Sequence, residues 1–230
     1  MNIGGLKKTS LLDYPGKIAA IVWTIGCNFR CPFCYNPQLV TGGVEPRSSQ
    51  EILDFLETRK GKLDAISITG GEPLMHDDID SFLSAIKDKG FLVKIDTNGS
   101  YPKKLGSLLT QHLIDYVSMD VKAPKDKYNH VAGVPVDLDA IETSLQLIQE
   151  KAPDYEFKTT VIPVFHTHDD IIQIGEWLKG SKRYFLQQFK SNTPLLSQEL
   201  AQVPAYSVEE LTELCERIKV FFNQCGVRGI

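Results

Sequence analysis

A short apolar strand, a loop and an amphipathic helix follow one another six times along the 230 residues of this chain. This alternation predicts one parallel sheet with helices packed outside it, because each helix returns the chain to the start of the next strand. Eight such units in about 250 residues would close a barrel, so six units predict a partial (β/α)6 barrel or an open doubly wound sheet. The expected strands are Ile18–Thr24, Ala65–Thr69, Leu92–Asp96, Tyr116–Met119, Phe157–Ile162 and Tyr184–Phe189.

The helices between these strands carry recognisable start signals. Ser48 with Glu51, and Ser207 with Glu210, have the spacing of capping boxes, in which side chains satisfy free backbone N–H groups at a helix start. We expect a single domain with its core at about residues 15–225 and an N-terminal extension of residues 1–14. The expected helices are Ser49–Lys60, Asp78–Lys89, Pro102–Gln111, Asp139–Glu150, Asp170–Lys179 and Val208–Asn223.

The composition narrows the class of protein. The net charge is −4 and there is no long basic run, which argues against nucleic-acid binding. The longest apolar run, Ile18 to Trp23, is far shorter than the ~20 residues of a membrane helix, and no apolar stretch follows the first lysines as in a signal peptide. We therefore expect a cytoplasmic protein without a membrane partner, in which clustered cysteines serve as metal ligands or catalytic groups.

Three of the five cysteines, Cys27, Cys31 and Cys34, follow the first expected strand with the spacing Cys-x3-Cys-x2-Cys. Cysteine thiolates are the usual ligands of iron–sulfur clusters. Three ligands on a four-iron cluster leave one iron without a protein ligand, and an open metal position is where a substrate can bind.

Two other interpretations of these cysteines stay open. Positions i, i+4 and i+7 share one helix face, so the three could be buried core, although Pro32 makes a long helix here unfavourable. A non-catalytic structural zinc site is the second alternative, and it would want a fourth ligand such as His76. Cys215 and Cys225 cannot form a second cluster by themselves and are expected to be core residues or free thiols.

Polar groups also follow the next three strands, where parallel α/β folds place their chemistry. Gly70, Gly71 and Glu72 follow the second strand, where glycines permit close approach of a ligand to the backbone and the alternative is an ordinary turn. Asp96 ends the third strand in the sequence Asp-Thr-Asn-Gly, and the Asn-Gly pair is also typical of a structural turn.

Asp120 and Lys122 share one face of the fourth strand, because side chains alternate with a period of two. They could contact a ligand, or they could form a surface ion pair of little energetic value. On the last two strands, Lys158 with Thr160, and Gln187 with Phe189, could line the same pocket or face outward.

The cysteine spacing, with Phe33 just before the last cysteine, resembles the radical S-adenosylmethionine (SAM) superfamily. The stretch from Leu6 to Lys17, together with Cys27 to Pro32, is similar to the activating proteins of glycyl radical enzymes, and most of all to that of anaerobic ribonucleoside-triphosphate reductase. The resemblance covers most of the chain. This sequence departs from the family pattern at Tyr35, where many relatives carry histidine.

The resemblance implies a radical SAM oxidoreductase whose reaction depends on a 4Fe–4S cluster and the cosubstrate SAM, with no further catalytic residue. It places the cluster on the three clustered cysteines. It also implies that the Gly-Gly-Glu-Pro segment holds the methionyl amino group and that the Asp-x-Lys pair contacts the cosubstrate. The implied cofactor-binding residues are Phe33, Gly70, Gly71, Glu72, Asp96, Asp120 and Lys122.

The same resemblance implies a reaction and partners. A reduced cluster cleaves SAM to a 5′-deoxyadenosyl radical, which takes a hydrogen atom from one glycine of a partner enzyme. That partner would be anaerobic ribonucleotide reductase or another glycyl radical enzyme such as pyruvate formate-lyase. Flavodoxin or ferredoxin would supply the electrons, and the missing strands of a partial barrel would leave a lateral mouth for the partner's loop.

Overall fold

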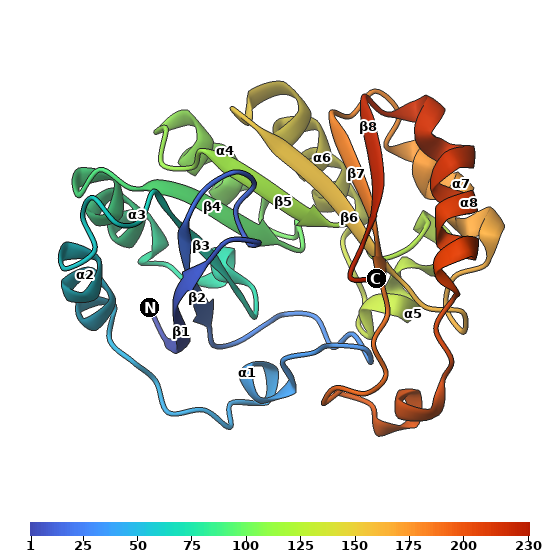
Figure 1. Ribbon diagram of the computed structural model, residues 1–230, viewed down its shortest axis with the longest axis horizontal. Coiled ribbons are helices and arrows are strands. Elements are labelled where there is room, and N and C mark those ends of the chain that lie inside the picture. Colours follow the sequence, from blue (N-terminus) through green and yellow to red (C-terminus); the bar gives the residue numbers. More distant parts are fainter.

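The computed structural model describes residues 1–230 and contains one curved sheet of eight strands, which are hydrogen-bonded in chain order (Figure 1). All six expected strands are present, with ends within two residues of those predicted. Two further strands, β1 and β8, extend the sheet at its two edges. The strands are β1 (Ile3–Ser10), β2 (Ala19–Thr24), β3 (Ala65–Gly70), β4 (Leu92–Thr97), β5 (Tyr116–Asp120), β6 (Tyr155–Val161), β7 (Arg183–Gln188) and β8 (Gln224–Arg228).

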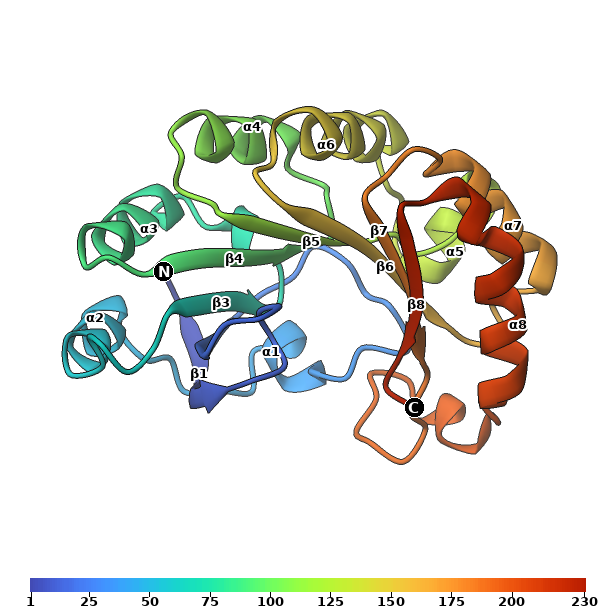
Figure 2. The ribbon, with the colours of Figure 1, turned by 45° about the horizontal axis from the view of Figure 1, so that its top comes forward.

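The sheet is an open barrel. Strand β1 pairs with β2 in the antiparallel direction, whereas β2 to β8 run parallel to one another. Strands β1 and β8 lie at opposite ends of the arc and do not pair (Figure 2). The fold therefore confirms the predicted partial barrel, and residues 3–10 of the expected N-terminal extension form an edge strand of the sheet.

The larger helices lie on the convex side of the sheet and leave the concave side to the loops that follow the strands (Figure 2). Ser207 and Glu210 form a complete capping box, with both reciprocal hydrogen bonds. At the start of α2, the Ser48 side chain accepts from the backbone N–H of Glu51, but the Glu51 side chain does not return the bond. No helix is both long and apolar enough to cross a membrane. The helices are α1 (Pro37–Thr41), α2 (Ser49–Glu57), α3 (Ile79–Asp88), α4 (Pro102–Thr110), α5 (Tyr128–Ala132), α6 (Leu138–Lys151), α7 (His168–Trp177) and α8 (Val208–Ile218).

The two faces of the sheet differ in polarity. On β4, Val93 and Ile95 are fully buried in the main apolar core. Lys94 and Asp96 alternate with them and so point to the opposite, concave face, where they form an ion pair. The helices thus receive the apolar side chains, and the concave face keeps the charged groups that build the site.

Candidate functional site

A cavity opens at the C-terminal ends of the parallel strands, with an empty volume of about 900 Å³ counted out to its mouth. The structure brings nearly all of the predicted site residues together here. The cavity wall includes Cys27, Cys31, Phe33, Cys34, Gly70, Gly71, Asp96, Asp120 and Lys122.

The cysteines lie on an irregular loop that neighbouring loops hold in place. The backbone N–H of Arg30 donates to the carbonyl of Ala132 at 2.9 Å, and the N–H of Ser197 donates to the carbonyl of Pro32 at 2.8 Å. Helix α1 begins only after the last cysteine of the motif. The alternative of three cysteines on one core helix face is therefore wrong.

The three thiols fit a cluster better than a single ion. Burial raises the pKa of Cys27 to about 11 and also raises that of Cys31. Both are therefore protonated thiols without a metal, and each releases its proton when a metal binds. No group of three or more potential ligands converges as a single metal ion requires. His76, which the zinc interpretation needs, is not part of the cavity wall. Three cysteines spread around one cavity are a suitable donor set for a multi-iron cluster.

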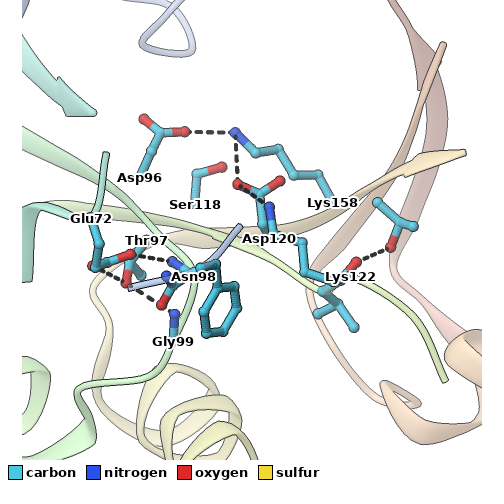
Figure 3. A network of polar contacts seen from close by, with 12 residues as sticks. Glu72, Asp96, Thr97, Asn98, Gly99, Ser118, Asp120, Lys122 and Lys158 are labelled. Carbon is cyan, nitrogen blue, oxygen red and sulfur yellow. Dashed lines mark hydrogen bonds and ion pairs between the residues drawn. The ribbon is translucent and has the colours of Figure 1, made fainter. Parts of the chain in front are cut away.

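Glu72 is the one predicted contact residue that the structure does not place in the cavity wall. Its carboxylate is fully buried. It accepts hydrogen bonds from the Thr97 hydroxyl at 2.8 Å and the Asn98 N–H at 2.7 Å (Figure 3), and from the Leu74 N–H at 3.1 Å. These donors come from the segment after β3, the last residue of β4 and the loop that follows it. Glu72 thus joins the loop after β3 to the end of β4, and its expected contact with the cosubstrate stays a prediction.

The buried carboxyl of Glu72 leads to a prediction about pH and stability. Burial raises its pKa to about 7, although Asn98 and Thr97 donate to the charged form. Because the folded pKa exceeds the unfolded value of about 4.3, the stability it contributes is fully present below that value and lost as the pH rises through about 7. Between pH 4.5 and 7.5 we expect the unfolding free energy of the cluster-free wild type to fall by about 3 kcal/mol more than that of Glu72→Gln.

Urea unfolding at a series of pH values measures this difference. Glu209→Gln, at an exposed glutamate on α8, is the control and should keep the wild-type profile. Parallel profiles for the wild type and Glu72→Gln would show that the buried carboxyl does not titrate in this range.

A chain of alternating charges crosses the cavity wall on β4, β5 and β6. Lys158 Nζ lies 2.8 Å from Asp96 Oδ1 and 4.0 Å from Asp120 Oδ2, and Lys122 Nζ lies 3.5 Å from Asp120 Oδ2 (Figure 3). Lys94 pairs with the other oxygen of Asp96. Because these groups lie inside the cavity, the alternative of a surface ion pair between Asp120 and Lys122 is wrong.

Within this set of charges, Asp96, Lys122 and Lys158 stay ionised. Burial by itself raises the pKa of Asp96, but Lys158 and Lys94 outweigh it and hold this pKa below its usual range. Burial likewise opposes the charge of Lys122 and of Lys158, but Asp120 together with other acidic neighbours outweighs it, so that both pKa values are raised. The cavity therefore offers fixed cations and anions to a zwitterionic ligand.

Lys122 is positioned from both of its ends. Its carbonyl oxygen lies 2.8 Å from Nε2 of His166, and its ammonium lies 5.9 Å from the centre of the Phe33 ring. His166 is fully buried, and its Nδ1 accepts from the N–H of Ile162 at 3.1 Å. His166 therefore fixes the backbone of Lys122.

The last strands also contribute to the cavity, which the sequence alone left undecided. Lys158, Thr160 and Gln187 lie in its wall. Tyr35 lies there too, and its hydroxyl accepts from the N–H of Lys190 at 2.8 Å. A tyrosine at this position thus fixes the chain after β7.

Cys215 and Cys225 are not part of the cavity wall. Their sulfur atoms lie 2.8 Å apart, between α8 and β8. The pair joins the last helix to the edge strand and takes no part in the site.

Comparisons with known proteins agree with this geometry. The family model "Radical SAM superfamily" matches residues 21–178. A protein of Methanocaldococcus jannaschii named "putative glycyl-radical enzyme activating enzyme" is 33% identical over 236 aligned positions, which cover 99% of this chain and 96% of that protein. A 7-carboxy-7-deazaguanine synthase of Methanopyrus kandleri is 32% identical over 132 positions, but these cover only 48% of this chain and 52% of that enzyme.

Among solved structures, SuiB of Streptococcus suis with bound SAM has a TM-score of 0.70 at 18% identity. The alignment covers 90% of this chain, which spans about half the length of SuiB (49%). At this identity the likeness concerns the fold. The sequence matches, the open barrel and the three cysteines at the cavity agree: the chain belongs to the radical SAM superfamily, whose members use a 4Fe–4S cluster and SAM.

Proposed function

We propose that this protein is an activating enzyme that reductively cleaves SAM and generates a glycyl radical on a partner enzyme. The observation that carries the proposal is the end-to-end similarity to the M. jannaschii protein named as a glycyl-radical enzyme activating enzyme. A second protein of that organism with the same name is 30% identical over 77% of this chain. The motif around Cys27 favours anaerobic ribonucleoside-triphosphate reductase as the partner, with flavodoxin or ferredoxin as the cytoplasmic electron donor.

The residues of the cavity would bind two groups, the cluster and the cosubstrate. Cys27, Cys31 and Cys34 would hold the cluster, which when bound supplies the electron that cleaves the sulfonium of SAM. The backbone at Gly70 and Gly71 offers carbonyl groups to the ligand's ammonium. Asp96, Asp120, Lys122 and Lys158 offer charge-assisted hydrogen bonds to its ammonium, carboxylate and ribose hydroxyls. The protein thereby supplies position and electrostatics to a reaction whose chemistry belongs to the cofactor.

The open side of the barrel supports a protein as the substrate. A second hollow, with an empty volume of about 690 Å³ counted out to its mouth, lies beside the first and shares Tyr35 and Asn36 with it. Gly4 and Gly5 of the edge strand β1 line this second hollow. We infer that a loop of a partner enzyme enters along this hollow, which lies between the sheet edge and the cosubstrate cavity.

The main alternative is a radical SAM enzyme that acts on a small molecule. The partial match to 7-carboxy-7-deazaguanine synthase favours this alternative. That match leaves half of the chain unaligned, whereas the match to the M. jannaschii protein is end to end. We therefore rank glycyl radical formation first.

The test combines the anaerobically reconstituted protein, a reductant and SAM with anaerobic ribonucleoside-triphosphate reductase. We expect an organic radical signal in paramagnetic resonance that is lost when the acceptor glycine of the reductase is changed to alanine. Pyruvate formate-lyase in a parallel sample tests the choice of partner. SAM cleavage without a radical on either enzyme would reject the proposed partners and favour a small-molecule substrate.

A further inference from the structure

We propose that the side-chain amide of Asn98 donates a hydrogen bond to the sulfur of Cys27 and thereby raises the reduction potential of the cluster. The inference rests on the proposed role of Cys27 as a cluster ligand. Asn98 belongs to the Asp-Thr-Asn-Gly turn after β4, where the sequence indicates only a turn residue beside Asp96. The structure gives its side chain a contact that a turn does not require.

The amide lies against the sulfur and has a defined orientation. Asn98 Nδ2 lies 3.9 Å from Cys27 Sγ and donates to Asn28 Oδ1 at 2.9 Å. Its Oδ1 accepts from the backbone N–H of Ser100 at 3.0 Å and from the hydroxyl of that residue at 2.5 Å. Because a backbone N–H can only donate, the atom facing Ser100 is the oxygen. The NH2 group therefore faces the cysteine.

The backbone of Asn98 is fixed as firmly as its side chain. Its N–H donates to the buried carboxylate of Glu72 at 2.7 Å (Figure 3), and only 6% of the residue is exposed. The loop after β3 thus holds the loop after β4, which in turn holds the amide on the cysteine loop. A group held in this way keeps its position when the charge of its neighbour changes.

Electrostatics gives the direction of the effect. Reduction adds negative charge to a cluster and its sulfur ligands, and an N–H donor stabilises the more negative state. Hydrogen bonds to the sulfurs are among the factors that set the potentials of iron–sulfur clusters. The backbone N–H of Phe29 also reaches Cys27 Sγ, at 3.4 Å, and it persists when a side chain is changed. Asn98 is the donor to this sulfur that a substitution can remove.

The test is an anaerobic redox titration of the reconstituted protein, monitored by the paramagnetic signal of the reduced cluster. For Asn98→Ala we expect about a tenfold lower ratio of reduced to oxidised cluster at a fixed potential, which is a shift of about 59 mV to more negative potential for one electron. Asn98→Asp, which keeps the shape and removes the donor, should shift it in the same direction and further.

Ser100→Ala is the matched control. It lies on the same loop and loses the hydroxyl contacts with Asn98 and Asn28, but the Ser100 N–H still holds the amide oxygen, so its potential should equal that of the wild type. Wild-type potentials in both Asn98 variants, with intact cluster content, would overturn the inference. So would a shift in Ser100→Ala as large as that in Asn98→Ala, because the loop as a whole would then set the potential.

A measurement on the wild type covers the case in which the variants do not take up a cluster. Protein labelled with 15N only in asparagine side-chain amides should show a 15N hyperfine coupling to the reduced cluster, and its absence would overturn the inference. A wild type that takes up no cluster would instead reject the proposed function, and this inference with it. Cluster content thus separates the two failures.

Discussion

Cys31→Ala should leave the protein folded but unable to hold its cluster, with loss of both the iron–sulfur paramagnetic signal and SAM cleavage. Cys31 is buried in the wall of the cavity, between the other two cysteines of the motif. Two remaining thiolates cannot retain a four-iron cluster that needs three. Iron and sulfide analysis after anaerobic reconstitution measures the loss, and circular dichroism checks the fold.

Cys215→Ala is the matched control for this variant. It removes a cysteine that is equally buried but lies outside the cavity, so cluster content and cleavage should equal those of the wild type. A Cys31→Ala protein that keeps a full complement of iron would contradict the ligand assignment. A cluster lost from the control instead would place the metal near α8.

Gly71→Ala should destabilise the protein by about 3 kcal/mol and lower the iron content after reconstitution. A Cβ on Gly71 would lie 1.6 Å from the carbonyl oxygen of Gly26, which is backbone and cannot turn aside as a side chain can. That carbonyl also accepts from the N–H of Glu72 at 2.8 Å. The new methyl group must therefore push the cysteine loop away from the loop after β3.

Gly43→Ala is the control, because a Cβ at Gly43 meets nothing within 4 Å. Its unfolding free energy and iron content should stay at wild-type values. Urea unfolding gives the free energy, and iron analysis reports the position of the loop. Equal stability for Gly71→Ala and Gly43→Ala would mean that the two loops do not meet as closely as the structure shows.

Much of the fold could be predicted from sequence because the apolar strands and amphipathic helices have distinct periodicities. The six inner strands are buried by helices and show this clearly. The edge strands β1 and β8 escaped prediction because an edge strand buries less. Three residues of β1 are exposed, and β8 contains no fully buried residue. Their patterns resemble those of loops.

The sequence predicts which residues line the candidate site, but not the hydrogen bonds that connect them. The cysteine spacing and the polar groups at strand ends are local signals, and the structure gathers them in one cavity. Glu72 and His166 each bond to a local partner, two and four positions away, and to a distant one, 25 and 44 positions away. What decides their roles is burial, which a single sequence does not show. The contact of Asn98 with Cys27 could not be predicted for a different reason, because it spans 71 positions.

The proposed function depends on Cys27, Cys31 and Cys34 holding a cluster that leaves room for SAM in the adjoining cavity. The most direct measurement is the yield of 5′-deoxyadenosine from the reconstituted, reduced wild type with SAM under anaerobic conditions. We expect 5′-deoxyadenosine and methionine in equal amounts, with neither formed by Cys31→Ala. A protein with a full, reducible cluster that leaves SAM intact would contradict the proposed function.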